Sequence, residues 1–326
     1  MNFVLITLDA FNYELSMDNI DCLPNLSRLK EAGVSFENAF SVGANTAFAF
    51  PGILAGVYPY SFGTIISRNI QTTDVVLKDC GYNTAFVNES NALLTPFFGY
   101  GRGLDFQEHF LSLSHKAADR KRQDSALEGT APRMSLRREL MRKLYGKLPG
   151  QQIRSLAIQL YRFTNFLRLR LRANTESLRE RRILYNAFRD RIVRFINEEF
   201  KEPQFLWMHT IVNHLPYLPP EESSKFTERE VDYLNYRALS GLVDHRISER
   251  LRSLYVESLK QTDQLLGEIM ASLNANDLLH DTLVIVTADH GEEFEKKHAG
   301  HSPESSSDSL LHVPLIFSCP YRFTGK

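Results

Sequence analysis

The sequence predicts an α/β fold built on a mostly parallel central sheet with helices on both faces. Three short apolar runs, at residues 3–8, 204–211 and 282–287, are typical of buried parallel strands, because strands covered on both faces are apolar along their length. Helical patterns occur at residues 24–32, at 73–80 before Gly81, and over the long amphipathic run 252–273. This alternation of strands and helices favours a parallel sheet.

Composition and charge divide the chain into two parts. Its 326 residues, 43% hydrophobic and 24% charged, suffice for one large α/β domain or for one domain with an insertion. The formal net charge is only -1, yet more than half of the Lys and Arg residues lie between Lys116 and Arg194. We therefore predict a catalytic α/β domain at residues 1–111 and 200–326, and an Arg-rich helical insertion at residues 112–199.

The Arg-rich insertion has two interpretations. As a functional element it is a cationic cap over an anionic substrate, or a contact with an anionic membrane surface. As a structural element it is a solvated helical excursion packed through its apolar residues, and we favour this simpler interpretation. No nucleic-acid-binding module accompanies the charge, so we expect no nucleic acid partner. The sequence leaves the oligomeric state open.

Targeting and cysteine patterns indicate the cellular compartment. The first apolar run has no basic segment before it and no cleavage site after it, and no apolar stretch is long enough to span a bilayer. Cys22, Cys80 and Cys319 show no C-x-x-C spacing, so we expect small buried side chains rather than disulfides or a zinc knuckle. We predict a cytoplasmic protein.

Three separated segments place reactive side chains at the ends of predicted elements. Asp9 follows the first strand, Asp289 and His290 follow the strand at 282–287, and Thr46 begins a short helix. Ligands bind at the carboxyl edge of such sheets, and an adjacent Asp and His offer an oxygen and an imidazole to one cation. The plainer alternatives are an aspartate that caps a helix, and a Thr46 that is only an N-cap.

These segments are part of a longer set of motifs that resembles the sulfatase branch of the alkaline-phosphatase superfamily. The set comprises residues 23–26 (LPNL), 33–41 (GVSFENAFS), 81–85 (GYNTA), 98–105 (FGYGRGLD), 214–220 (HLPYLPP), 289–292 (DHGE) and 312–316 (HVPLI). They follow the family's order and cover nearly everything outside the basic insertion. The resemblance implies an alkaline-phosphatase-like three-layer sandwich.

Departures from the family pattern bear on the chemistry. Sulfatases carry a Cys or Ser that becomes formylglycine and an Arg four residues later, and here these positions are Thr46 and Phe50. Glu89 and Asn91 stand near the positions of the family's Lys and His. A Thr nucleophile resembles the phosphodiesterases, pyrophosphatases and phosphoethanolamine transferases of the superfamily, where Thr attacks phosphorus.

The resemblance also implies the site residues. One divalent metal ion would be bound by Asp9, Thr46, Asp289 and His290. Zn or Mn suits this mixed set of oxygen and nitrogen ligands better than Ca or Mg. Thr46, His214 and His301 would be catalytic, and Asn91 and His298 would contact substrate. We expect His209 to be a buried strand histidine without a role, and we find no residue pair for a second metal.

Three functions remain open from the sequence. The leading one is a metal-dependent hydrolase or transferase that acts through Thr46 on phosphoryl esters, of phosphodiester, phosphonate or phosphoethanolamine type. The alternatives are a sulfuric ester hydrolase without formylglycine and an inactive anion-binding homologue. The expected partner is an anionic small molecule, or a substrate linked to a lipid or a glycan.

Overall fold

The computed structural model describes residues 1–59, 65–111, 178–295, 298–301 and 305–319. Within these residues, seven strands form one sheet in the order β2-β9-β6-β1-β5-β3-β4. Five of them run parallel: β1 (Asn2–Leu8), β3 (Asn83–Asn88), β4 (Phe106–His109), β5 (Gln204–Thr210) and β6 (Thr282–Ala288). At one edge β9 (Leu315–Ser318) pairs antiparallel with both β6 and β2 (Gly33–Phe36). The predicted mostly parallel sheet is confirmed.

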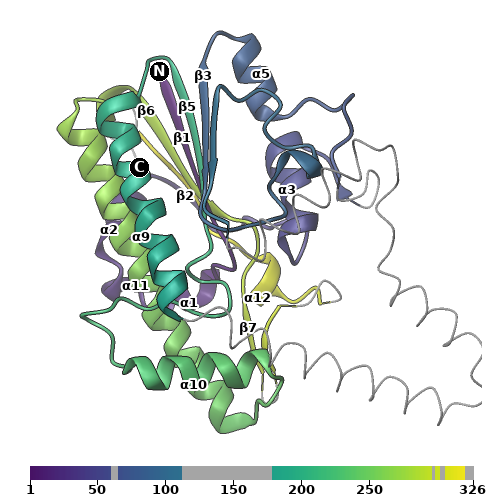
Figure 1. The fold of residues 1–326 in the computed structure, drawn as a ribbon, viewed down its shortest axis with the longest axis vertical. Coiled ribbons are helices and arrows are strands. Elements are labelled where there is room, and N and C mark those ends of the chain that lie inside the picture. Colours follow the sequence, from purple (N-terminus) through teal and green to yellow (C-terminus); the bar gives the residue numbers. More distant parts are fainter. Residues whose placement is uncertain (60–64, 112–177, 296–297, 302–304, 320–326) are drawn as a thin grey trace, which may run out of the picture.

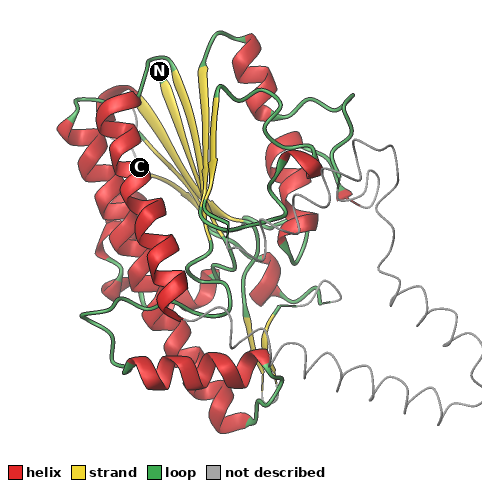
Figure 2. Cartoon of the chain, in the orientation of Figure 1, coloured by secondary structure: helices red, strands yellow, loops and turns green. Residues whose placement is uncertain are grey.

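Helices cover both faces of the sheet and make three layers (Figures 1 and 2). One side carries α2 (Pro24–Glu31), α9 (Leu178–Arg194) and α11 (His245–Ala275), and the other carries α3 (Thr46–Ala55) and α5 (Thr73–Asp79). The remaining elements are α1 (Tyr13–Asp18), α10 (Glu228–Leu239), α12 (Asp308–Leu311), the short helices Ile20–Cys22, Pro96–Phe98, Phe195–Glu199 and Leu279–Asp281, and a hairpin of β7 (Glu293–Glu295) and β8 (His298–Gly300). Each helical layer has its own hydrophobic core against the sheet.

The three predicted strands and three predicted helices are present with small shifts at their ends. The largest difference is in α11, which begins at His245 rather than at residue 252. Asp244 explains this early start, because its side chain accepts a hydrogen bond from the Ile247 backbone N–H and caps the helix. The cysteines differ from expectation: Cys319 is buried, but Cys22 and Cys80 are exposed.

The last part of the predicted insertion belongs to the main helical layer. Tyr185, Phe188 and Ile192 of α9 are at most 1% exposed and lie in the same core cluster as the inner residues of α11. Burial of an apolar side chain of this size contributes about 1.5–3 kcal/mol. Residues 178–199 are therefore part of the α/β core, whereas residues 112–177 of the predicted insertion lie outside the described part of the chain.

Strand register brings the reactive residues to one edge of the sheet. β1 lies between β5 and β6, and its last residue, Leu8, is level with Thr210 and with Ala288. The next backbone N–H groups continue the two ladders, with Asp9 N donating to the Thr210 carbonyl at 2.9 Å and Asp289 N donating to the Leu8 carbonyl at 3.2 Å. The side chains that follow β1 and β6 therefore emerge next to each other.

Candidate metal centre and active site

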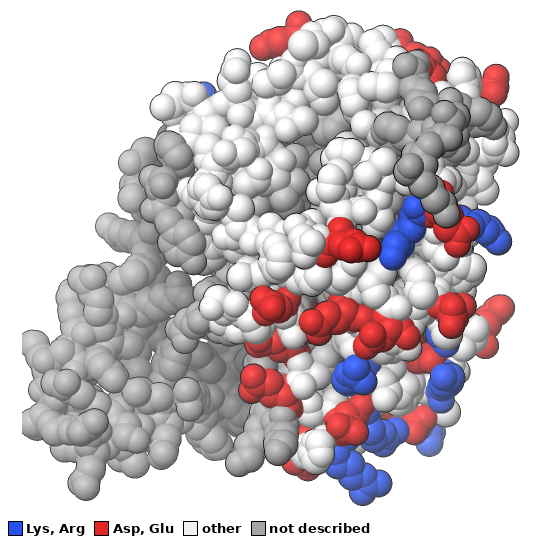
Figure 3. All heavy atoms as spheres, turned by 180° about the vertical axis from the view of Figure 1, so that it is seen from behind, with Lys and Arg blue, Asp and Glu red and all other residues white. Residues whose placement is uncertain are grey.

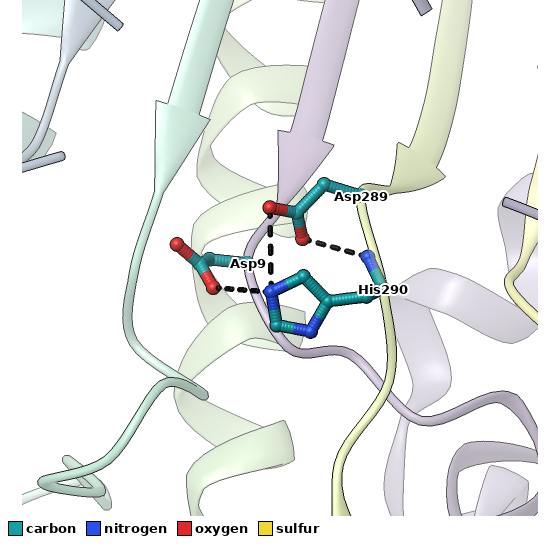
Figure 4. A group of neighbouring side chains, drawn as sticks. All are labelled: Asp9, Asp289 and His290. Atoms are coloured by element: carbon teal, nitrogen blue, oxygen red, sulfur yellow. Dashed lines mark hydrogen bonds and ion pairs between the residues drawn. The ribbon is translucent and has the colours of Figure 1, made fainter. Parts of the chain in front are cut away.

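Asp9, Asp289 and His290 form a compact, fully buried cluster at this edge (Figure 4). One potential ligand atom from each residue lies within 4.8 Å of the others. The His290 Nε2 atom is 3.5 Å from Asp9 Oδ1 and 3.6 Å from Asp289 Oδ2. The structure thus brings together three of the four predicted metal ligands.

Hydrogen bonds to the backbone fix the directions of the Asp289 and His290 side chains. Asp289 Oδ1 accepts from the backbone N–H of His290 at 2.8 Å and from that of Ala10 at 3.3 Å. Ala10 adopts a left-handed conformation with a φ of 56°, which is uncommon for a residue other than glycine, and its carbonyl accepts from the buried Tyr255 hydroxyl at 2.7 Å. The His290 Nδ1 atom lies 2.8 Å from the Gly291 carbonyl, so it is Nδ1 that carries the proton and Nε2 that offers a lone pair.

The cluster has the chemistry of a divalent cation site. Asp9 Oδ1, Asp289 Oδ2 and His290 Nε2 are buried and have no hydrogen-bond partner among the described residues. Burial and the nearby Asp9 carboxylate raise the pKa of Asp289 well above its ordinary value, whereas burial lowers the pKa of His290 to about 3. Burial of two carboxylates and a neutral imidazole, each with an unpartnered atom that faces the same point, costs free energy unless a cation lies among them. The residues present therefore fit a bound metal ion.

Thr46 is the first residue of α3 rather than its N-cap. The capping residue is Asn45, whose side chain accepts a hydrogen bond from the Phe48 backbone N–H at 3.1 Å. Thr46 is 5% exposed; its hydroxyl accepts a hydrogen bond from Asn91 Nδ2 at 3.3 Å, and its proximity acts to lower the pKa of the Asp289 carboxylate. The side chain thus lies beside the metal cluster, and helix capping does not account for its position.

Asn91 lies between the nucleophile candidate and Asp9. Its Nδ2 atom donates to Asp9 Oδ2 at 2.9 Å as well as to Thr46. The amide is held in place because Asn91 Oδ1 accepts from the Leu93 backbone N–H at 3.0 Å. In this structure Asn91 contacts the site residues themselves.

His209 is the buried strand histidine that was expected, but it also contacts Asp9, and sequence reasoning missed that contact. It is fully buried near the end of β5, and its Nε2 atom is 3.3 Å from Asp9 Oδ2. The signal that could have found it is its register, since a histidine opposite Thr7 lies beside the end of the strand that carries Asp9. Burial alone raises the pKa of Asp9, but His214, His209 and His290 surround it and hold it below its ordinary value.

His214 and His301 lie beside the cluster. The ring centroid of His301 is 4.2 Å from that of His290 and 5.0 Å from that of His214. Burial lowers the pKa of His214. For His301 burial acts in the same direction, but the Glu292 carboxylate, hydrogen-bonded to its Nδ1 atom at 3.1 Å, outweighs burial, and the pKa of His301 is raised. The backbone of His298 is in β8, and its side chain lies outside the description.

Phe50 and Glu89, two of the departures from the sulfatase pattern, have structural roles. Phe50 is fully buried in the core between α3 and the sheet, where it packs against Trp207 and Tyr100. Glu89 is also buried, and its Oε2 atom accepts from the Thr210 hydroxyl at 2.6 Å and from the Ile211 backbone N–H at 2.8 Å. Neither side chain offers a positive group to an anion.

The fold is similar to that of several solved enzymes. The phosphonate monoester hydrolase of Agrobacterium radiobacter has a TM-score of 0.58 and 16% identity, with 98% of this chain and 68% of that chain covered. The C-terminal periplasmic domain of the phosphoethanolamine transferase EptC from Campylobacter jejuni has a TM-score of 0.57 and 16% identity, with 97% and 78% covered. The corresponding EptC domain from Escherichia coli, solved in complex with Zn, has a TM-score of 0.54 and 12% identity, with 98% and 74% covered. Identities this low show the fold alone.

Sequence comparison finds relatives among the arylsulfatases. Arylsulfatase K of Mus musculus is 33% identical over 98 residues, which is 30% of this chain and 14% of the mouse protein. Arylsulfatase K of Homo sapiens is 31% identical over 111 residues, which is 33% of this chain and 20% of the human protein. The family model described as Sulfatase matches residues 1–324, nearly the whole chain, and the chain therefore belongs to the sulfatase family.

Proposed function

We propose that this sulfatase-family enzyme is a metal-dependent hydrolase or transferase of phosphoryl esters, with Thr46 as its nucleophile. One observation carries the proposal. The buried Thr46 hydroxyl is hydrogen-bonded to Asn91 at the start of α3, beside the three unpartnered ligand atoms of Asp9, Asp289 and His290. A nucleophile needs such a position, where its oxygen is oriented by a fixed partner and can face the electrophilic phosphorus of the substrate.

Asp9, Asp289 and His290 would hold the metal ion, with the Thr46 hydroxyl as a further oxygen ligand. When bound, the ion would supply a Lewis acid that offsets negative charge on the phosphoryl oxygens. The mixture of carboxylate oxygen and imidazole nitrogen suits Zn or Mn, and Ca or Mg would bind less well. The solved Zn complex of the Escherichia coli transferase domain supports Zn.

The protein side chains divide the reaction between them. Thr46 Oγ1 attacks phosphorus as its hydroxyl proton passes to water, and the bond from phosphorus to the leaving oxygen breaks as the new bond forms. Asn91 orients the hydroxyl, while the backbone N–H groups of the first turn of α3 stabilise the anionic phosphoryl group. His214 or His301 would protonate the leaving oxygen. An acceptor, water in a hydrolase or an alcohol in a transferase, then releases the phosphoryl group from Thr46.

A sulfuric ester hydrolase is the second candidate, and the similarity to the arylsulfatases favours it. We place it second because Thr46 cannot become formylglycine by the sulfatase route and because the buried Phe50 occupies the place of the anion-binding Arg. The decisive assay is a screen of aryl phosphate mono- and diesters, phosphonates and sulfates with Zn, Mn, Mg and Ca, with Thr46→Ala as control. Preference for sulfate esters would reverse the order of the two candidates, and inactivity on every ester would favour an inactive anion-binding homologue.

Substrate class and cellular location stay predictions. We propose an anionic substrate, free or linked to a lipid or glycan, and a cytoplasmic protein. None of the described helices is long and apolar enough to cross a membrane.

On the face shown in Figure 3, Lys and Arg among the described residues lie intermixed with Asp and Glu. In α9, Arg191 pairs with Glu108 and Glu199, so it contributes no open cationic surface.

A further inference from the structure

We infer that His209 is a positioning residue that holds Asp9 in the orientation where only its Oδ1 atom faces the metal ion. The inference rests on the proposed metal site and adds to it a residue that is not itself a ligand. Two donors occupy the other carboxylate oxygen, since Asp9 Oδ2 lies 3.3 Å from His209 Nε2 and 2.9 Å from Asn91 Nδ2. Asp9 Oδ1 has no partner within the described residues and lies 3.5 Å from His290 Nε2.

The hydrogen bonds behind His209 are compatible with the ring tautomer that donates to Asp9. Indole N–H can only donate, so Thr7 Oγ1 accepts from Trp207 Nε1 at 3.0 Å. The Thr7 hydroxyl also lies 3.0 Å from His209 Nδ1. The Asp9 carboxylate can only accept, so its contact with His209 is a hydrogen bond when Nε2 carries the ring proton; Asn91 Nδ2, also 3.3 Å from Nε2, would donate to this atom in the other tautomer. We assign the proton to Nε2. Nδ1 then accepts from the Thr7 hydroxyl, whose single proton is shared with the Met208 carbonyl at 3.0 Å.

Aromatic packing prevents the imidazole from turning away. The edge of the Phe50 ring meets His209, with ring centroids 5.1 Å apart and an interplanar angle of 85°. Trp207, which donates to Thr7, is stacked on Phe86 with centroids 3.5 Å apart. His209, Trp207 and Phe50 are each at most 1% exposed, so the whole assembly is held inside the protein. Phe50 also belongs to α3, the helix that begins at Thr46, and it couples the position of His209 to that of the nucleophile.

The consequence is a defined mode of metal binding. Hydrogen bonds from outside the ligand shell orient ligands and raise metal affinity, and their removal commonly lowers affinity about 10- to 100-fold. Without the donor at Nε2, the Asp9 carboxylate can rotate and present both oxygens to the ion. Both the affinity and the coordination number of the site would then change.

Two polar substitutions separate the Nε2 contact from the rest of the ring. His209→Asn keeps an amide near the position of Nδ1, within reach of Thr7, but it is too short to reach Asp9. His209→Gln places an amide N–H near the position of Nε2 and should restore the contact. Met208→Ala is the matched control, because Met208 is the preceding residue on β5, is 1% exposed and packs in the core on the other face of the sheet.

The test is a calorimetric titration of each metal-free protein with Zn²⁺, together with the visible absorption spectrum of its Co²⁺ complex. We expect His209→Asn to bind Zn²⁺ about 10- to 100-fold more weakly and to show an altered Co²⁺ spectrum, while His209→Gln and Met208→Ala resemble the unmodified protein. Unchanged affinity and spectrum in folded His209→Asn would overturn the inference, as would equal losses in the Asn and Gln variants.

Failure of the metal site itself gives a different result. Asp289→Asn removes a proposed ligand oxygen and should abolish tight Zn²⁺ binding. If the unmodified protein bound no Zn²⁺, or if Asp289→Asn bound it normally, the proposed function would fail and the role of His209 with it. If those two proteins behave as expected and His209→Asn binds normally, only the role of His209 is refuted.

Discussion

Replacement of Thr46 separates its role as a nucleophile from any role in helix stability. In Thr46→Ala the hydroxyl that bonds to Asn91 is lost, but Asn45 and its cap on Phe48 remain. Asn45→Ala is the converse change, because it removes the cap and leaves the hydroxyl. The two neighbouring positions should therefore affect different quantities.

The expected magnitudes follow from these contacts. Loss of the covalent route should lower kcat of Thr46→Ala on the order of 10⁴-fold, a rise in the barrier of about 5 kcal/mol. Its free energy of unfolding should fall by no more than about 1.5 kcal/mol, because the one lost hydrogen bond, with Asn91, contributes about 0.5–1.5 kcal/mol. Asn45→Ala should lose about 1 kcal/mol of stability and keep kcat within about tenfold. Thr46→Ser keeps the hydroxyl and should retain measurable activity.

The assay is steady-state hydrolysis of the best aryl ester from the substrate screen, with denaturant unfolding and metal analysis of each variant. Mass spectrometry of the enzyme quenched at low pH should detect a phosphorylated Thr46. A Thr46→Ala protein that is folded, loaded with metal and fully active would refute the nucleophile, and so would a kcat loss in Asn45→Ala as large as that in Thr46→Ala.

Three further predictions concern the metal and the leaving group. A chelator should lower the thermal midpoint, because a ligand present at 100 times its Kd stabilises the folded state by about 2.7 kcal/mol; an unchanged midpoint would exclude a tightly bound ion. Without metal, Asp289 has a folded pKa above its unfolded value, so the folded state holds more protons and loses stability as pH rises through that pKa. Metal-free Asp289→Asn should therefore be more stable than the metal-free unmodified protein at neutral pH in urea unfolding, and equal stability there would contradict the cost of burying a charged Asp289 beside Asp9. His301→Ala should lower kcat about 10²- to 10⁴-fold for poor leaving groups and much less for p-nitrophenol, and a loss independent of the leaving group would argue against proton donation.

Much of the site could be predicted because strand ends are visible in a sequence. An apolar run followed by Asp9, and another followed by Asp289 and His290, already placed these residues at one edge of a parallel sheet. The contact of His209 with Asp9 was missed because a histidine within an apolar run has the same local pattern whether it fills space or supports a ligand. Only the pairing of β5 with β1 distinguishes the two cases.

Local sequence thus determined the secondary structure, the mostly parallel sheet and the residue types of the metal cluster, because hydrophobic periodicity and strand-terminal polar residues act over short distances along the chain. The tertiary structure decided everything that depends on contacts between distant segments. It assigned the helix cap to Asn45 and left Thr46 beside the metal cluster, it placed residues 178–199 in the core, and it brought His209 to Asp9 across 200 positions of sequence. Hydrogen bonds and buried charges depend on distance in space, and strand register and helix packing set that distance.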